Sequence, residues 1–326
     1  MLNNEASCRI RSAGDLLGAV PYVLGFHPEN SFVALLLDSD HRVQAGCRAD
    51  LNIAVPELIA TLREARGPRT AAIVLLGYGP VPDPDRLNDI IGGLRGDVIV
   101  TGGLWVTANE YRCVWDGCDC PARNGVPFDA RATASAATLT AQGQVAVASR
   151  DELLAQLAPD PIAQARVQAE LDQHGGPDPL FALADALGAA ERGQRLTAGQ
   201  VAALVLALRD PHVRDQAWQA TDDLPWQRQL WFDLTRRIPD DHVSGVAALA
   251  AWWSWRAGHE LLAREALNRA FDNGRPAQLA VTVARLVTGR IDPASLPWPM
   301  DSASPPARLR SRSGPEAPAG VVHPAT

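Results

Sequence analysis

The sequence predicts an α/β domain followed by an all-helical domain. Up to residue 158, apolar runs of strand length alternate with amphipathic segments. After residue 159 the strand patterns almost disappear, whereas helical periodicity continues. From Pro297 the chain is rich in Pro, Ser and Arg. We therefore expect an α/β domain at 1–158, a helical domain at 159–296 and a disordered tail at 297–326.

Composition narrows the classes of function. A net charge of −7 disfavours general nucleic-acid binding. All 30 basic residues are arginine, which excludes Schiff-base chemistry and a P-loop lysine. Five cysteines are too few for a disulfide framework, and no apolar run is long enough to span a membrane. Because Asp15 and Pro21 interrupt the first apolar run, a signal peptide is not expected. We expect a cytoplasmic protein without nucleic-acid or membrane partners.

The first elements are a helix and a hairpin. Residues 15–20 form a short helical pattern, which Pro21 is expected to end. The apolar run 32–37 and the stretch 42–51, joined by a polar turn, predict a β-hairpin. The loop before this hairpin is the densest group of special residues in the chain.

Alternating helices and strands follow the hairpin. They are expected at 56–66 (helix), 71–76 (strand), 84–94 (helix) and 97–100 (strand). Short strands at 104–106 and 110–115 would add an antiparallel pair. Runs that are apolar on both faces predict a mixed sheet with flanking helices. Gly77-Tyr78-Gly79-Pro80 is interpreted as a tight strand-to-helix turn, because its prolines lack the amide donors of a phosphate loop.

The second half contains eight segments with helical periodicity. They are 161–173, 178–191, 197–209, 211–220, 225–237, 242–257, 259–272 and 276–288. The spacing of Gly258, Ala263, Leu267 and Ala270 is similar to the second half of a tetratricopeptide repeat, so one TPR-like helical hairpin is expected. Six of the nine tryptophans lie between Trp218 and Trp255, and we expect most of them in the core rather than in a peptide groove.

Two groups of residues are candidate ligand-binding sites in the α/β domain. The first is the loop before the hairpin, with Gly25, His27, Asn30 and Ser31. His27 could act as a base or metal ligand, or it could simply cap a turn shaped by Gly25 and the following proline.

Arg48 and Asp50 form the second group and alternate along the returning strand. They could bind an anionic ligand, with Asp50 orienting Arg48. A structural ion pair at the end of the strand is an equally good interpretation.

Three cysteines give the sharpest chemical signal. Cys113, Cys118 and Cys120 lie within one strand end and loop. Three thiolates could hold zinc with a fourth ligand from elsewhere, for which His27 is a candidate. The spacing differs from the standard Cys-x2-Cys pair, so a redox pair and a turn with partly buried thiols also remain open.

Several of these stretches resemble the actinobacterial DUF4192 family. They are Arg11–Leu17, Pro21–Ser31, Arg48–Leu51, Leu75–Tyr78, the Cys113/Cys118/Cys120-Pro121 cluster and Trp255–Gly258. The resemblance covers almost the whole chain before the tail. It implies a bacterial protein but no activity, because the family is one of unknown function. The chain departs from the family pattern at Asn30 and in the spacing of Cys118 and Cys120.

The chain lacks a complete catalytic motif. We therefore predict a ligand- or protein-binding adaptor whose helical domain binds a protein partner. The alternative is a hydrolase or transferase that uses His27, Ser31, Arg48 and Asp50. A cysteine-based zinc or redox site is the second alternative.

Overall fold

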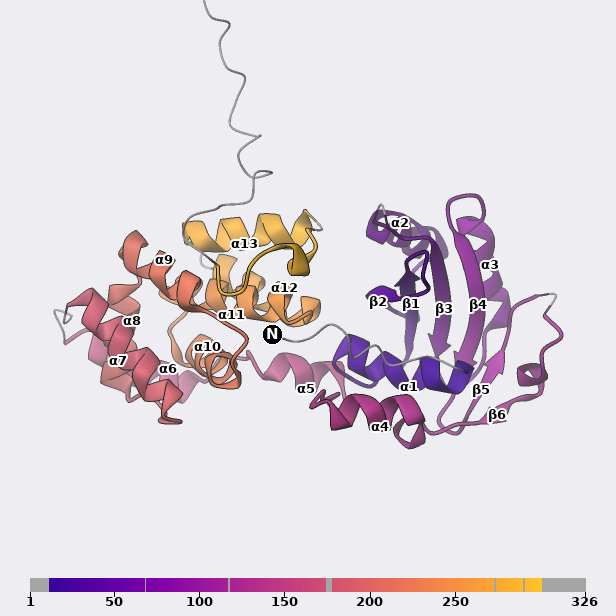
Figure 1. Cartoon of the computed structure of the whole chain (residues 1–326), viewed down its shortest axis with the longest axis horizontal. Helices are drawn as coiled ribbons and strands as arrows, with labels where there is room; N and C mark the ends of the chain where they lie inside the picture. Colours follow the sequence, from indigo (N-terminus) through magenta and orange to yellow (C-terminus); the bar gives the residue numbers. More distant parts are fainter. Residues whose placement is uncertain are drawn as a thin grey trace, which may run out of the picture. The chain divides into compact units, whose positions relative to one another are not determined.

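The computed structural model describes residues 12–67, 69–116, 118–173, 178–272, 274–289 and 291–300. It divides into two compact units, shown in Figure 1. One comprises the described residues up to Asp160 together with His259–Ala266, and the other comprises Pro161–Gly258 and the described residues from Leu267 onward. A mixed sheet with flanking helices fills the first unit and helices fill the second, which confirms the expected fold class.

The sheet of the first unit has six strands. They are β1 (Ser31–Leu37), β2 (Val43–Asp50), β3 (Ala72–Tyr78), β4 (Ile99–Val106), β5 (Glu110–Cys113) and β6 (Val126–Pro127), in the order β2-β1-β3-β4-β5-β6. Strands β3 and β4 are parallel, and the other neighbours are antiparallel. The predicted hairpin is the β1–β2 pair.

Helices cover both faces of this sheet. On one face, Phe32 and Leu36 of β1 pack against α2 (Val55–Ala65) and α3 (Pro84–Leu94). On the other face, Val33 and Leu35 pack against α1 (Ala13–Leu24). Because neither face of the sheet is exposed to solvent here, all seven residues of β1 and all seven of β3 are buried. This burial on both faces is the reason why β1 and β3 appear in the sequence as continuous apolar runs.

Shorter elements complete the first unit. They are the 3-10 turns η1 (Pro121–Asn124) and η2 (Ala130–Ala132) and the helices α4 (Ala134–Ala141) and α5 (Arg150–Ala155). Helix α4 packs against α1.

Two predictions about individual elements were wrong. Pro21 does not end the first helix but lies inside α1, whose buried side includes Leu17 and Val20. A proline inside a helix removes one hydrogen bond, and burial of this side outweighs that loss. The helix instead ends at Gly25, whose φ of +83° suits glycine.

The strands expected at 97–100 and 104–106 are one strand, β4. Gly102 and Gly103 do not interrupt it, because both pair with β3. A register shift between Ile73 and Val74 accommodates the local irregularity.

The second unit is built from the helices that the periodicity predicted. They are α6 (Pro161–Leu171), α7 (Pro179–Glu191), α8 (Ala198–Ala207), α9 (Pro211–Ala220), α10 (Pro225–Arg237), α11 (Ser244–Arg256), α12 (Glu260–Phe271) and α13 (Gln278–Thr288). The unit division passes through α12. Helix α11 is central, because its residues from Val246 to Trp255 are all buried. Trp231, Trp252, Trp253 and Trp255 are buried, as expected for core residues.

The chain continues past α13 with the short 3-10 turn η3 (Pro293–Ser295). The expected tail was to begin at 297, yet Met300 is buried and Trp298 packs on Trp253. The remainder of that predicted tail, from 301 onward, lies outside the described residues. Of the helices in the described part of the chain, none combines the length and apolarity that crossing a membrane requires.

Gly77 is required by the packing of Trp105. A Cβ atom on Gly77 would overlap the Trp105 ring, which is buried and fixed by a 3.1 Å hydrogen bond from its Nε1 to the Gly79 carbonyl. We predict that Gly77→Ala lowers the free energy of unfolding by about 1–3 kcal/mol, because the core cannot absorb the methyl group. Differential scanning calorimetry would measure this loss.

Gly92 in α3 is the matched control, because a Cβ there meets nothing within 4 Å. Gly92→Ala is expected to be neutral or stabilising by about 0.5–1 kcal/mol, since alanine favours a helix interior. Equal destabilisation by the two substitutions would contradict the role of Trp105.

Candidate functional site

Three cysteines meet where β5 ends. Cys113 is the last residue of β5, lies opposite Leu104 of β4 and is buried. The chain then turns, and the Cys118 N–H donates to the Trp115 carbonyl at 3.2 Å. Cys120 immediately precedes the 3-10 turn η1. Three thiols thus lie within eight successive residues, between the end of a strand and the start of a 3-10 turn.

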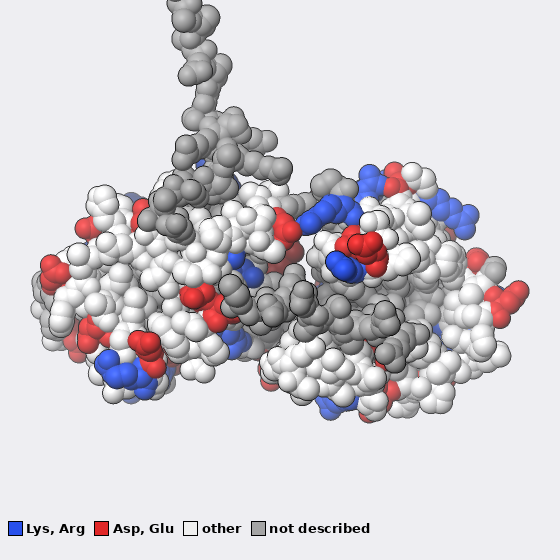
Figure 2. Space-filling model, in the orientation of Figure 1, with Lys and Arg blue, Asp and Glu red and all other residues white. Residues whose placement is uncertain are grey.

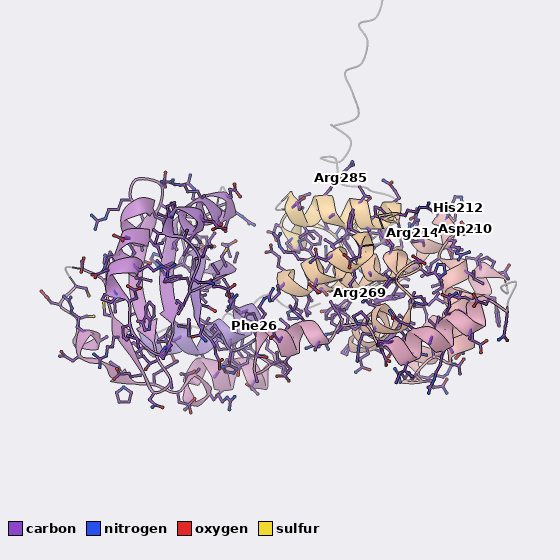
Figure 3. The ribbon with its side chains drawn as sticks, turned by 180° about the vertical axis from the view of Figure 1, so that it is seen from behind. Phe26, Asp210, His212, Arg214, Arg269 and Arg285 are labelled. Atoms are coloured by element: carbon purple, nitrogen blue, oxygen red, sulfur yellow. The ribbon has the colours of Figure 1, made fainter. Side chains whose placement is uncertain are left out.

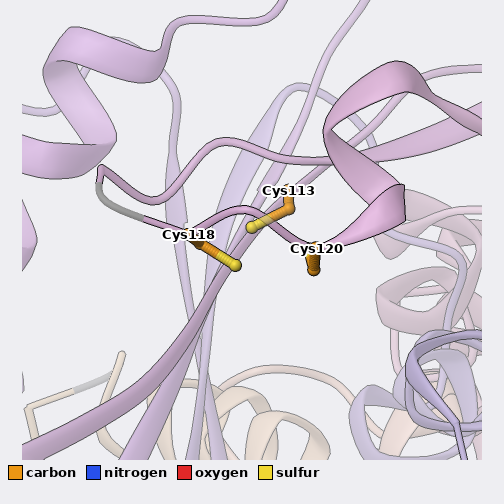
Figure 4. A group of neighbouring side chains, drawn as sticks. All are labelled: Cys113, Cys118 and Cys120. Atoms are coloured by element: carbon orange, nitrogen blue, oxygen red, sulfur yellow. The ribbon is translucent and has the colours of Figure 1, made fainter.

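The sulfur atoms are close enough to share a metal ion. The three Sγ atoms lie within 4.8 Å of one another, and Figure 4 shows the sulfurs of Cys113 and Cys118 turned toward each other beside Cys120. Three atoms at such separations have a common point within about 2.8 Å, and a Zn–S bond is about 2.3 Å long. An inward shift of about 0.5 Å per sulfur would therefore suffice for coordination.

Hydrogen bonds from Asn88 and Arg123 hold the chain between Cys113 and Cys118. Asn88 of α3 donates to the Val114 carbonyl at 2.9 Å and accepts from the Asp116 N–H at 3.1 Å. On the other side, Arg123 donates through Nη1 to the Cys118 carbonyl at 3.0 Å. The loop is therefore already ordered, which reduces the entropy lost when a ligand binds.

The thiols differ in proton affinity. Burial raises the pKa of Cys113 to about 12, opposed by a backbone hydrogen bond at Trp115 and reinforced by the neighbouring thiols. The pKa of Cys118 is lowered, first by the backbone N–H of Cys120, then by hydrogen bonds from the other two thiols and by the charge of Arg123. Cys118 therefore loses its proton before Cys113. Only a bound cation would stabilise all three groups as thiolates near neutral pH.

The described residues contribute three ligands to this group. No fourth His, Cys, Asp or Glu ligand joins it within the described ranges, so His27, the expected candidate, is not part of it. Cys47 packs on the opposite face of the sheet, toward α2 and α3. Cys8, the fifth cysteine, lies outside the described residues.

The first predicted ligand-binding group lies in the loop after α1. Phe26, labelled in Figure 3, forms a parallel β-bridge with Val147. The His27 N–H donates to the Val147 carbonyl, and the Val147 N–H donates to the Gly25 carbonyl, both at 3.0 Å. Asn30 has a φ of +44°, and its carbonyl accepts from the Leu51 N–H at 3.0 Å. Backbone hydrogen bonds therefore fix this loop at both ends.

The His27 side chain is partly buried. Its pKa is lowered from the usual value, first by burial and then by the charge of Arg131, while Asp129 and Glu29 oppose the shift. The imidazole is therefore neutral near pH 7. Its charged neighbours come from its own loop and from the η2 region. In the described part of the chain, no hydrogen bond joins it to Arg48 or Asp50.

Ser31, Arg48 and Asp50 do lie together. Arg48 donates through Nε to the Ser31 hydroxyl at 2.7 Å, and its Nη1 lies 2.6 Å from Asp50 Oδ1. The Ser31 hydroxyl donates to the Glu29 carbonyl at 2.5 Å. This network ties the start of β1 to the end of β2, as the structural interpretation of the ion pair anticipates.

The two groups occupy different parts of one sheet face. Arg48 and Cys113 belong to the same row of paired residues, which runs through Val33, Leu76 and Leu104. Their strands are four spacings apart, or about 19 Å at about 4.8 Å per spacing. The three thiols and the Arg48–Asp50 ion pair are therefore separate sites.

Tyr78 is a polar residue that the sequence did not single out. It lies opposite Ser31 at the end of β3, and its buried hydroxyl has no hydrogen-bond partner among the described residues. Burial raises its pKa. In the sequence, Gly77 and Gly79 indicate only a turn at this position. That the Tyr78 hydroxyl is unsatisfied can be recognised only from the three-dimensional structure.

His27 should make stability depend on pH. Its folded pKa lies below the unfolded value of about 6.5, so the fold favours the neutral ring. This contribution is complete above the unfolded pKa and is lost as the pH falls below about 6.5. We therefore compare Tm at about pH 7.5 and about pH 5.5, an interval that spans the titration of histidine. We predict that over this interval Tm falls more in the wild type than in His27→Gln. Parallel Tm profiles from scanning fluorimetry would contradict this effect.

Comparison with known proteins identifies the family alone. Neither a curated protein nor a solved structure is significantly similar to the chain. The model of a family described as a domain of unknown function, DUF4192, matches residues 14–294. This match includes the sheet, the three thiols and all the helices described above. The chain therefore belongs to the DUF4192 family.

Proposed function

We propose that this protein is a binding or adaptor protein whose first unit holds a zinc ion through Cys113, Cys118 and Cys120. The observation that carries the proposal is the approach of three sulfurs to within 4.8 Å of one another. Thiolates are soft ligands, which bind zinc in preference to magnesium or calcium. The hydrogen bonds of Asn88 and Arg123 order the loop in advance.

The chemistry of such a site follows from charge and coordination number. Three thiolates and Zn²⁺ carry one net negative charge, which Arg123, bonded to the Cys118 carbonyl, would offset. Zinc takes four ligands in a tetrahedron, so the fourth position would be filled by water, by a bound ligand or by a fourth protein side chain. A water or ligand there would make the site exchangeable, whereas a fourth thiolate would make it structural.

Metal content tests the proposal directly. We predict about one zinc per chain, as expected for one tetrahedral site, in protein purified under reducing conditions without a tag or chelator. Single serine substitutions at Cys113, Cys118 or Cys120 should each release most of the zinc on dialysis against a chelator. Cys47→Ser is the matched control and should retain it, because Cys47 packs on the opposite face. Elemental analysis by mass spectrometry would give the ratios.

A second measurement avoids dependence on variants that fail to fold. Wild-type protein stripped of metal and refilled with Co²⁺ should show the thiolate charge-transfer and strong d–d bands of a tetrahedral sulfur site. X-ray absorption of the zinc form should give three sulfurs at about 2.3 Å with a lighter fourth atom, or four sulfurs if the fourth ligand is a thiolate. Two results would overturn the zinc proposal. One is that the metal-free protein develops no cobalt–thiolate bands when Co²⁺ is added, and the other is that two of the three thiols can be detected only after reduction.

The remaining parts of the proposal concern the second unit and the location. We assign the protein-binding role to the helical unit, which offers repeated helices without a catalytic motif. An actinobacterial cytoplasm is proposed because all residues of the Lys/Arg type are arginine and because Cys113, Cys118 and Cys120 are free thiols. We expect no nucleic-acid partner. In Figure 2 acidic and basic side chains occur side by side on the visible face of each unit, and the net charge is −7.

A further inference from the structure

The three clustered thiols differ in their access to solvent. Cys113, at the end of β5, is buried, whereas Cys118 and Cys120 are half-buried. All three belong to or pack against the apolar cluster between the sheet and α1. A small dissolved oxidant can therefore reach the sulfur of Cys118 or Cys120 directly. Cys113 is screened from solvent, so its sulfur reacts with a neighbouring sulfur rather than with the oxidant.

Cys113 is the best placed partner for Cys118. The two sulfurs are turned toward each other (Figure 4) and lie no more than 4.8 Å apart. A covalent bond between them requires an approach of at most about 2.8 Å. Rotation of the Cys118 side chain between staggered rotamers supplies such a movement. The backbone hydrogen bonds of Cys118, to the Trp115 carbonyl and from Arg123, remain intact during this rotation.

The other accessible thiol, Cys120, is a poorer partner for Cys118. Only Asp119 separates the two residues, so a disulfide between them would close a small ring. Cys120 also precedes Pro121, the first residue of η1, and a following proline restricts the backbone angles of Cys120. A change in these angles therefore cannot relieve strain in the ring. We expect Cys120 to remain a thiol.

Formation of the disulfide requires a two-electron oxidant, for which a hydroperoxide is the simplest chemical class. The Cys118 sulfur attacks a peroxide oxygen, the O–O bond breaks, and the products are a sulfenic acid and an alkoxide or hydroxide. The Cys113 sulfur then attacks the Cys118 sulfur, the S–S bond forms and hydroxide leaves. Protons from solvent neutralise both leaving groups. Each of the two sulfurs loses one electron, and the peroxide gains two.

This reaction would remove two of the three zinc ligands. The sulfurs of a disulfide carry no charge and are weak ligands, so Cys120 would be the one thiolate left on the metal. A single thiolate does not hold zinc against dissociation. The neutral disulfide also suits the apolar surroundings of Cys113 better than metal-free thiolates would.

We propose that Cys118 is a site of reversible oxidation by hydroperoxides, that Cys113 closes the disulfide, and that closure releases the zinc ion. The inference rests on the zinc site of the proposed function and adds its regulation. Reduction by a dithiol restores the three thiols and, with them, zinc binding.

The first test uses the full-length, zinc-loaded chain purified under reducing conditions. Hydrogen peroxide is added and is then removed with catalase. A chromogenic chelator should detect the release of about one zinc per chain. Dithiothreitol followed by zinc should restore the original zinc content. Cys47→Ser is the matched control and should lose zinc at the wild-type rate, because Cys47 packs on the opposite face of the sheet.

Peptide mapping identifies the bond that forms. After free thiols have been blocked, trypsin and an endoproteinase that cuts before aspartate together leave one cysteine in each fragment of this loop. The cleavage sites are after Arg112 and Arg123 and before Asp116 and Asp119. Mass spectrometry of the oxidised chain should find fragment 113–115 linked to fragment 116–118.

Serine variants oxidised in the metal-free state assign the role of each thiol. Cys113→Ser and Cys118→Ser should each form at least about ten-fold less disulfide than the wild type, because the remaining pairs are less well placed. Cys120→Ser should form the Cys113–Cys118 disulfide to the wild-type extent. Circular dichroism before oxidation shows that each variant is folded.

The outcomes separate this inference from the proposed function. A chain that holds no zinc before oxidation would contradict the proposed function and the release step, whereas the metal-free chain tests the disulfide in either case. Four results would overturn the inference alone. They are a different disulfide pairing, equal disulfide formation by Cys113→Ser, retention of zinc after the bond has formed, and zinc loss that dithiothreitol does not reverse.

Discussion

Burial of the central sheet on both faces is the constraint on which the first unit depends. Strands β1 and β3 contribute no exposed residue, because α2 and α3 cover one face and α1 the other. Polar chemistry is therefore confined to strand ends and to the edge strands. The thiols follow the end of the short strand β5, and Arg48 lies on the edge strand β2. The separation of these two groups is a consequence of the sheet order.

The second unit has a corresponding constraint in α11. A helix that is apolar around its circumference must be covered on every side, and α9, α10 and α13 supply most of this cover. At its C-terminal end the cover is the segment at residues 291–300, held by Arg256 and Trp298. This cover is a single short segment that has few anchors.

The sequence predicted the elements where periodicity and turn chemistry agreed. Helix α3 has the expected bounds, 84–94, because Asp83 caps it and Pro84 starts it. Local rules failed where tertiary packing decided: Pro21 stays inside α1, and Gly102 and Gly103 stay inside β4. The thiol spacing matched no standard motif, so only the fold could show that three sulfurs converge. The packing of residues 291–300 was missed because their composition is that of a tail, while their contacts come from residues 37 to 77 positions away in the sequence.

The state of the polar atoms explains why the thiols, and not the loop at His27, carry the proposed function. Ser31 is occupied by Arg48 and the Glu29 carbonyl, and Arg48 also binds Asp50. A catalytic site needs donors and acceptors directed at a substrate, whereas these are directed at one another. The three sulfurs lie within 4.8 Å of one another, and as thiolates they would repel unless a cation lay between them. The zinc ion that we propose would account for this convergence, whereas the Ser31 network is explained by the fold.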